Sequence, residues 1–435
     1  MNSPALSRGT NSNSTTTYTN LLIYGIASVV FISYIYSGMF WAIIYKEMLN
    51  GQGNIYFSIS ALAIITILWL MSLSLRFRNG FFSEMLLVVL LIAYLLICAL
   101  YSPSIVSRNT EINFVLFNIP ACFIIGYIIY FQGFVLEFAT CVIAIALYGL
   151  LTVNIELTYE AKMEDININY QVINSLFSGA AITSFAIIFD SRIHRAVRAV
   201  LACGLIIFSF AILYTGGRGG LLFVLAGTLA MLIGVLKRYI VRLFLLSGVM
   251  IVTIGLNYDS IIDAIIVFAN EHNLATVQRI VYYVSTGNNI NTVENRETLA
   301  ELAWSVWNSN ILFGVGLGGF PVAAGFGDAN GLYPHNIALN ILADLGLAGA
   351  VILCAYVGRY YIVAYKSIVD TNKLEKLILV GLAAGDMATL NVFGEFVSDR
   401  VLWVTLGACS AIYVKYKLAH RLKKPSAPIG RRMAS

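Results

Sequence analysis

The stretch MLLVVLLIAYLLICALY, from Met85 to Tyr101, runs for 17 residues without a charged side chain. A helix needs about 17–25 such residues to cross a bilayer. Similar runs recur along the 435-residue chain, which is 59% hydrophobic and only 11% charged, whereas soluble domains contain about 25% charged residues. The alternating short segments of a membrane barrel do not occur. The sequence therefore predicts an all-α protein that crosses the membrane many times.

We predict about 12 transmembrane helices, most of them before a long polar segment and the last three after it. Their approximate bounds are Leu21–Tyr45, Ile55–Leu75, Met85–Tyr101, Phe114–Phe131, Phe134–Val153, Val172–Phe189, Ala199–Tyr214, Leu221–Leu236, Tyr239–Leu256, Ile337–Val357, Leu377–Phe393 and Val401–Val414. The chain thereby divides into a disordered tail, a membrane region, an outer segment, a second membrane region and a basic tail: residues 1–20, 21–256, 257–336, 337–416 and 417–435.

Lysine and arginine are distributed unevenly between the two sides that this topology defines. One side, which includes both termini, holds all but seven of the 27 basic residues. The seven on the other side are Lys46, Arg108, Lys162, Arg218, Arg279, Arg296 and Arg400. Basic residues accumulate in cytoplasmic segments of membrane proteins. We therefore expect cytoplasmic termini and an external segment 257–336, which would be periplasmic in the inner membrane of a Gram-negative cell.

The turn TGGRGG, Thr215 to Gly220, joins two predicted spans on the outer side. Its glycines allow a tight turn and close approach of a ligand. The first N–H groups of the following helix, together with its dipole, favour an anion, and Arg218 adds a planar fork that suits phosphate oxygens. We predict a diphosphate site at Arg218, Gly219 and Gly220. The alternative is a plain turn whose arginine reaches lipid headgroups.

Arg296 and Arg279 are further candidate diphosphate ligands in the outer segment. Arg296 lies in the first turn of a predicted helix that carries Trp304 and Trp307, a composition typical of the membrane interface. A cation is unfavourable at that end of the helix dipole, so a bound anion would stabilise it, although Glu297 could pair with it instead. Arg279 lies on an amphipathic run and could be a solvent-facing residue.

The outer segment ends with Tyr333-Pro334-His335-Asn336, directly before a span. Pro334 restricts the backbone and Asn336 can cap the next helix, so His335 is expected at a rigid corner, where it could accept a proton or be structural. No two of the four histidines have metal-ligand spacing, so we predict neither metal nor cofactor. The run FGVGLGGF, Phe313 to Phe320, is interpreted as a flexible turn rather than a nucleotide-binding motif.

These residues together resemble a known family. His335-Asn336, followed after nine residues by Gly346-Leu347-Ala348-Gly349, is similar to the signature of O-antigen ligases. The order of features before this signature is also similar to that family. An outer arginine comes first, then a long outer segment with an arginine before a tryptophan-containing helix, and then a Gly-Val-Gly turn. The family often has serine before the first arginine, where this chain has Gly217. O-antigen polymerases of the same superfamily share much of this pattern.

The resemblance implies a membrane glycosyltransferase with a GT-C-like fold, needing neither nucleotide sugar nor metal. Its donor would be a glycan on undecaprenyl diphosphate, and its acceptor a lipid A-core sugar in a ligase or another lipid-linked glycan in a polymerase. The arginines would stabilise the departing diphosphate, and His335 is our candidate base in an inverting displacement. If His335 bound the diphosphate instead, Asp344 or Asp399 would have to accept the proton. Membrane lipids would be the other partners, and no nucleic acid would be bound.

A transporter or lipid flippase is the alternative from a different class. Transporters often carry charged residues deep inside their spans. Most acidic residues near the predicted spans lie toward the span ends, and only Asp386 lies well inside one, which the sequence does not explain. We therefore favour the transferase, and among transferases the ligase over the polymerase.

Overall fold

The computed structural model describes the larger part of the chain. The described residues are 25–29, 31–32, 35, 80–152, 170–190, 192–214, 218–235, 258–271, 277, 294–328, 332–371 and 374–423. The predicted spans Ile55–Leu75 and Tyr239–Leu256, most of Leu21–Tyr45, and Arg279 lie outside these residues.

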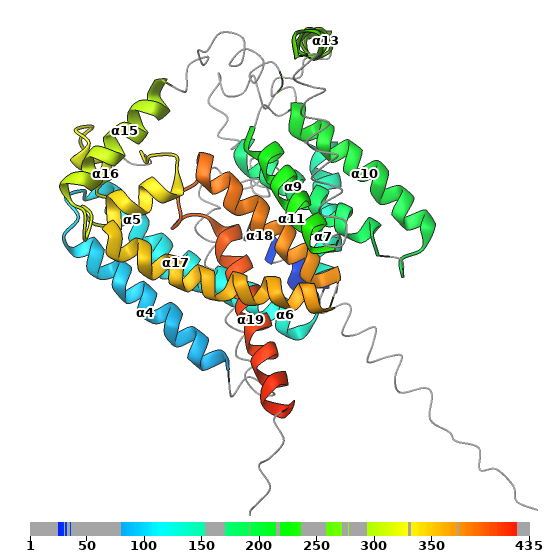
Figure 1. Cartoon of the computed structure of the whole chain (residues 1–435), viewed down its shortest axis with the longest axis horizontal. Helices are drawn as coiled ribbons and strands as arrows, with labels where there is room; N and C mark the ends of the chain where they lie inside the picture. The colour runs from blue at the N-terminus through cyan, green and yellow to red at the C-terminus, as the bar shows by residue number, and fades with distance from the viewer. Residues whose placement is uncertain are drawn as a thin grey trace, which may run out of the picture.

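Helices make up every regular element of the described residues, and no strand occurs among them (Figure 1). The elements are α4 (Phe81–Leu100), α5 (Val106–Asn113), the π-helix η1 (Phe114–Asn118), α6 (Ile119–Gln132), α7 (Val135–Thr152), α9 (Tyr170–Ile188), α10 (Arg195–Tyr214), α11 (Arg218–Val235), α13 (Tyr258–Glu271), α15 (Glu294–Ser309), α16 (Phe320–Ala323), α17 (Ile337–Thr371), α18 (Leu374–Phe393) and α19 (Arg400–Lys423).

Four helical segments within the described residues are long and apolar enough to cross a membrane: Phe81–Leu100, Val106–Gln132, Arg195–Tyr214 and Ile337–Ala364. Three shorter apolar helices, Val135–Leu151, Ile173–Ile188 and Gly219–Ile233, coincide with further predicted spans. The chain is therefore a helical membrane protein, as predicted. The total of 12 spans, the GT-C-like class and the orientation in the bilayer stay predictions.

Two helices extend beyond their predicted bounds. The span predicted from Phe114 begins at Val106, because α5, η1 and α6 follow one another without a break. Pro120 has no N–H to donate to the carbonyl of Leu116, so one hydrogen bond of a regular α-helix is missing there. The π-helix η1 lies at this point of the sequence, as expected where the α-helical hydrogen bonding is interrupted. Helix α17 continues past Val357, so Arg359 lies inside a helix rather than in a connecting loop. Its guanidinium is 3.0 Å from the carboxylate of Glu84.

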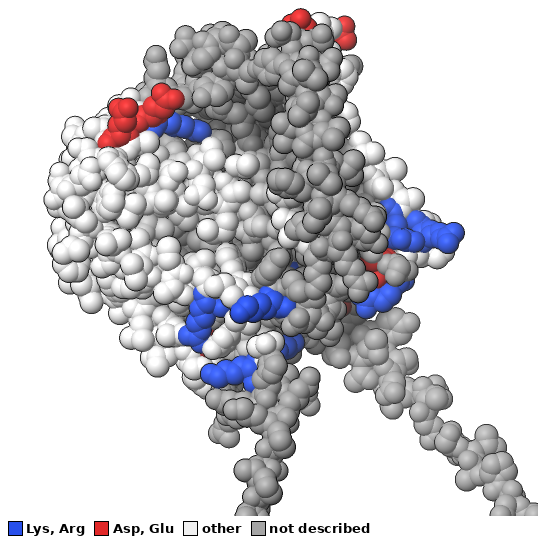
Figure 2. All heavy atoms as spheres, viewed as in Figure 1, with Lys and Arg blue, Asp and Glu red and all other residues white. Residues whose placement is uncertain are grey.

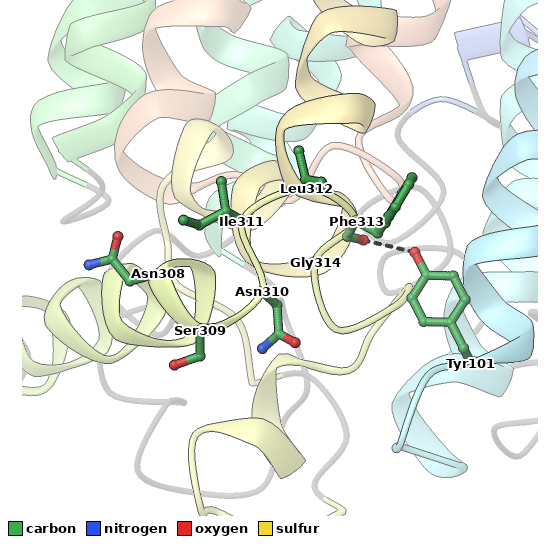
Figure 3. Close-up of a pocket in the computed structure, with 8 residues that line it drawn as sticks. All are labelled: Tyr101, Asn308, Ser309, Asn310, Ile311, Leu312, Phe313 and Gly314. Carbon is green, nitrogen blue, oxygen red and sulfur yellow. Dashed lines mark hydrogen bonds between the residues drawn. The ribbon is translucent and has the colours of Figure 1, made fainter.

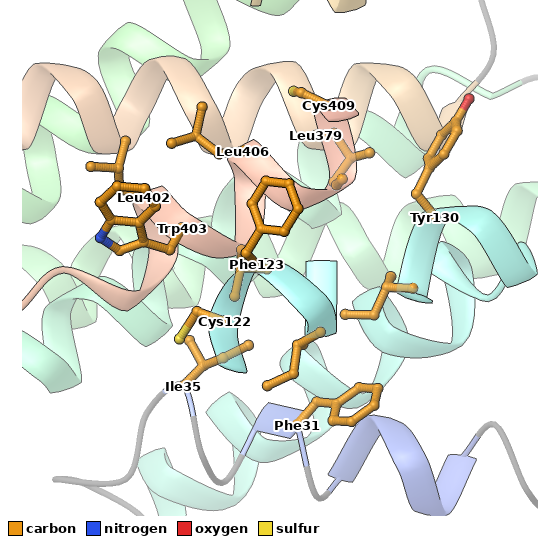
Figure 4. Close-up of a cluster of buried hydrophobic side chains, with 14 of the residues drawn as sticks. Phe31, Ile35, Cys122, Phe123, Tyr130, Leu379, Leu402, Trp403, Leu406 and Cys409 are labelled. Carbon is orange, nitrogen blue, oxygen red and sulfur yellow. The ribbon is translucent and has the colours of Figure 1, made fainter. Parts of the chain in front are cut away.

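Glycines set the distance between α6 and α19, which cross at the centre of the molecule. A Cβ on Gly126 would lie 1.8 Å from the carbonyl oxygen of Val404, and one on Gly407 would lie 2.0 Å from that of Phe123. Close backbone approach through small residues is the usual way that helices associate in membranes. Around this crossing lies the buried cluster of Figure 4, in which the indole N–H of Trp403 donates to the carbonyl of Phe396 at 2.9 Å.

The same principle joins α11 to α18. A Cβ on Gly227 would lie 2.5 Å from the carbonyl oxygen of Gly381, and one on Gly385 would lie 2.5 Å from that of Phe223. The two helices therefore pack with their backbones in near contact. This packing matters for the site, because α11 begins at Arg218.

Most acidic and most basic side chains lie on different parts of the surface in the view of Figure 2. On the face shown in Figure 2, acidic side chains lie over α15 and α13, whereas most basic side chains lie over the end of α19 and the start of α10. The basic residues of these two helix ends belong to the side that we predict to be cytoplasmic.

Candidate functional site

His335 occupies a strained corner before α17. Its backbone has a φ of 55°, and it is the one non-glycine residue with a positive φ in the described part of the chain. Such a conformation costs about 1–3 kcal/mol and often occurs at functional sites. The ring centroids of His335 and Tyr333 are 4.2 Å apart, and Nδ1 of His335 has no hydrogen-bond partner among the described residues. The imidazole therefore has a buried ring nitrogen with no partner in the described part of the chain.

Burial, and secondarily the positive charge of Arg296, lowers the pKa of His335 to about 4. Both effects disfavour the imidazolium form. The imidazole is consequently neutral at physiological pH and can accept a proton. An anion bound near Arg296 would offset the second effect and raise this pKa.

Asn336 caps α17, as the sequence predicted. Its side-chain oxygen accepts the backbone N–H of Leu339 at 3.0 Å, which satisfies one of the free donors of the first helical turn. Its side-chain amide donates to the carbonyl of Asn391 at 3.0 Å, so the cap also attaches the start of α17 to α18.

Helix α18 holds the starts of α11 and α17 at the same end of the bundle. The hydroxyl of Thr389 donates to the carbonyl of Gly219 at 3.2 Å, and two residues later the carbonyl of Asn391 receives the amide of Asn336. The Arg218 backbone and the His335 corner are thus anchored to neighbouring residues of one helix. Asp386, one turn earlier on α18, is buried, and nothing in the structure explains it.

The predicted diphosphate residues Gly219 and Gly220 form the first turn of α11. A Cβ on Gly220 would lie 3.0 Å from the Ser178 hydroxyl, which donates to the Gly220 carbonyl at 3.1 Å. Gly220 therefore allows α9 to pack closely against α11. The N–H groups of a first helical turn have no acceptor within the helix, so the site can still present them to an anion, and their role in binding stays a prediction.

Arg296 lies in the first turn of α15, as predicted, and its charge acts on His335. The helix packs through Leu299, Ala303 and Val306, which repeat at the spacing of one helical face. The same cluster includes Phe320 of α16 and Ala343 of α17, so packing fixes α15 beside the helix that follows His335. The Trp304 and Trp307 rings also lie together on α15, 4.7 Å apart.

The glycine-rich run before His335 was wrongly predicted to be a flexible turn. Residues 316–320 are buried, and the carboxylate of Asp344 accepts the backbone N–H groups of Gly318 at 3.2 Å and Phe320 at 3.1 Å. A Cβ on Gly316 would come within 2.7 Å of the carbonyl oxygen of Cys98. The glycines are needed because the run is packed tightly between α4 and α17.

This run and the residues before it insert into a break in α17. At Gly346, φ is 65° and ψ is −166°, so the helix is interrupted there. Four backbone hydrogen bonds of 2.8–3.0 Å join the two segments, donor first: Leu347 to Ile311, Ala348 to Leu312, Val315 to Ala343, and Gly316 to Asp344. In an unbroken helix, the donors and acceptors of α17 in this set would bond to each other. The outer segment therefore replaces the helical bonds that the break removes.

Asp328 attaches the end of this segment to α5. Its carboxylate accepts the hydroxyl of Ser104 and the backbone N–H groups of Ile105, at 2.8 Å, and Val106, at 3.1 Å. These hydrogen bonds, that of Ser104 foremost, lower the pKa of Asp328. The sequence did not indicate this role of Asp328. The residue caps α5 from more than 200 positions away in the chain, and such a contact leaves no local sequence pattern.

The two substitute bases have structural partners. Asp344 holds the glycine-rich run, and Asp399 accepts the backbone N–H of Leu402 at 2.9 Å and so caps α19. Among the residues that the structure describes, no group of three histidine, cysteine or acidic side chains could hold a metal ion. Because both aspartates already accept backbone N–H groups, His335 beside Arg296 is the arrangement better suited to accept a proton near an anion.

One comparison with known proteins finds a family match in this part of the chain. Residues 203–354, from α10 into α17, match a protein-family model described as O-antigen ligase. The matched segment contains Arg218, Arg296 and His335. No curated protein matches the chain. Residues 203–354 are thus similar to the O-antigen ligase family, which supports the O-antigen ligase and polymerase superfamily that the sequence resembles.

Proposed function

We propose that the protein is an O-antigen ligase that transfers a glycan from undecaprenyl diphosphate to a lipid A-core sugar at the periplasmic face of the inner membrane. The observation that carries this proposal is the pairing of His335 with Arg296 within the matched family segment. A neutral imidazole beside a fixed cation suits a reaction that needs one base and one stabilised anionic leaving group.

In the proposed reaction an acceptor hydroxyl attacks the anomeric carbon of the donor sugar. The new glycosidic bond forms as the bond to the diphosphate oxygen breaks, and the hydroxyl proton passes to His335. Arg218, Arg296 and Arg279 would bind the diphosphate and stabilise the charge that grows on it. A single direct displacement inverts the anomeric configuration. Diphosphate binding near Arg296 would also raise the pKa of His335 and make it a better base.

The test is turnover by purified protein supplied with undecaprenyl-diphosphate-linked glycan and one of two acceptors. Growth of the lipid A-core would support a ligase, whereas elongation of a second lipid-linked glycan would identify the repeat-unit polymerase. A protein that moves the donor across a membrane but makes no new covalent product would be a transporter, which would refute the proposal.

Variants separate the roles of the site residues. His335→Ala should lose about 10²–10⁴ in rate while retaining donor affinity, because a base acts mainly in the transition state. Arg296→Ala should weaken donor binding as well. Arg218→Lys should be strongly impaired, since lysine lacks the planar fork. His194→Ala, before α10, is the matched control and should be unaffected. Wild-type turnover by His335→Ala would exclude the base assignment.

A further inference from the structure

An open cavity lies at the other end of α15 from Arg296. It has a volume of about 580 Å³ and is lined by Tyr101, which follows α4, and by residues 308–314, which form the end of α15 and the segment after it (Figure 3). Small-molecule sites commonly have volumes of about 300–1,000 Å³. None of the lining residues belongs to the diphosphate and base site described above.

The walls of this cavity are fixed by hydrogen bonds. The hydroxyl of Tyr101 donates to the carbonyl of Phe313 at 2.8 Å, and the indole N–H of Trp307 donates to that of Ile311 at 3.2 Å. The backbone hydrogen bonds between residues 311–316 and α17 fix the same segment as well. A preformed cavity loses little conformational entropy on binding a ligand.

The chemistry of the lining favours a neutral, hydroxyl-bearing ligand. None of the eight lining residues carries a charge, so nothing there would pair with a phosphate or a cation. The Asn308 amide can both donate and accept, whereas the Ser309 hydroxyl and the Asn310 amide already donate to the carbonyls of Ser305, at 3.1 Å, and Val306, at 3.2 Å, and offer their oxygens as acceptors. Tyr101 and Phe313 offer ring surfaces. Asn308 is exposed, and its side chain makes no hydrogen bond within the described residues. A sugar ring, with hydroxyl groups at its edge and C–H groups on its faces, matches this combination.

The cavity opens where the lipid-facing surface of α4 ends. Ile97 and Leu100 of this membrane-spanning helix are 59% and 81% exposed, and Leu312 and Phe313 across the Tyr101 hydrogen bond are 61% and 63% exposed. An apolar surface this exposed is stable where it contacts lipid. The exposed surface of α4 thus continues onto the rim of the cavity, which puts the cavity at the level of the bilayer surface.

We propose that this cavity binds a neutral sugar of a membrane-anchored glycolipid. The identification of that glycolipid as a substrate rests on the proposed function. Arg296 and Asn308 lie on one helix, and twelve residues at the rise of an α-helix separate them by about 18 Å. An oligosaccharide can extend over that distance, so the cavity would bind a glycan at a point several sugars away from the reacting bond.

The experiment uses n-octyl-β-D-maltoside as the probe, below its micelle concentration, with the protein in lipid nanodiscs. Saturation-transfer NMR should show contact with the maltose protons and a saturable affinity. Ser309→Trp fills the cavity and should weaken binding at least 10-fold. Ser305→Trp is the matched control, on an exposed position of the same helix outside the cavity, and should leave binding unchanged. Asn308→Ala should weaken binding without affecting the fold, since its amide has no hydrogen-bond partner among the described residues.

Octylphosphocholine, which has the same chain and a charged headgroup, should not compete with the maltoside. Equal competition would show general lipid contact and would overturn the proposal, as would unchanged maltoside affinity in Ser309→Trp. The measurement requires no catalysis. Loss of sugar binding with normal transfer would therefore refute only the proposal that this cavity binds a sugar. Sugar binding without any transfer would refute the proposed function.

Discussion

Replacing Arg296 with alanine should raise the pKa of His335, but only in part. Two causes lower that pKa from 6.5 to about 4, and burial is the larger of them. The substitution removes the second cause, the guanidinium charge, and leaves the burial. Less than half of the difference should therefore be recovered, so that the pKa in the variant stays below about 5.3.

The direction of the effect on stability follows from the same values. At pH 6 a histidine with a pKa of 4 is about 1% protonated, whereas one with the unfolded value of 6.5 is about 75% protonated. The unfolded chain thus binds more protons than the folded protein between pH 4 and 6.5. Folding stability should fall as the pH decreases through this window, and should not depend on His335 above it.

Histidine-selective NMR measures the pKa directly, because the chain has only four histidines. His335→Gln identifies the resonance, which is then titrated in the wild type and in Arg296→Ala. Arg192→Ala is the control, since this arginine pairs with Asp190 at 2.8 Å, just before α10. A wild-type pKa near 6.5, or complete restoration by Arg296→Ala, would refute the reasoning.

Three further predictions concern the scaffold. Gly407→Val should abolish the yield of monodisperse protein, because even a Cβ would lie 2.0 Å from the carbonyl oxygen of Phe123; normal yield would show that α6 and α19 can separate. Asn336→Ala should cost about 1–2 kcal/mol through loss of the cap, seen as a lower melting temperature in detergent, and an unchanged value would remove the capping role. Asp328→Ala should accelerate hydrogen exchange at the Val106 amide and leave α18 unaffected, whereas equal protection in both proteins would contradict the capping of α5.

Local patterns predicted the features that depend on neighbouring residues. Long apolar runs identified the membrane helices, and the Asn336 side chain was correctly expected to cap α17. The first-turn position of Arg296 followed from the periodicity of the helix after it. In each case the physical cause acts within a few residues of the chain, where a sequence pattern records it.

Features that depend on distant contacts were not predicted. The role of the glycines before His335 was misjudged because glycine suits both a mobile turn and a packed crossing, and only the carboxylate of Asp344 and the backbone of α4 decide between them. The attachment of Gly219 and Asn336 to one end of α18 is another such feature, since neither Thr389 nor Asn391 has a sequence context that indicates a partner.

The break of α17 at Gly346 changes what a match to the family signature means. The stretch Gly346-Leu347-Ala348-Gly349 contains no group suited to acid-base chemistry; its N–H groups receive the outer segment at Ile311 and Leu312. We expect another chain with this stretch to attach its outer segment to a broken membrane helix in the same way, independently of the sugar that it binds. Motif searches centred here would therefore sort proteins by architecture, and substrate preference would have to be sought in the residues that the seated segment exposes.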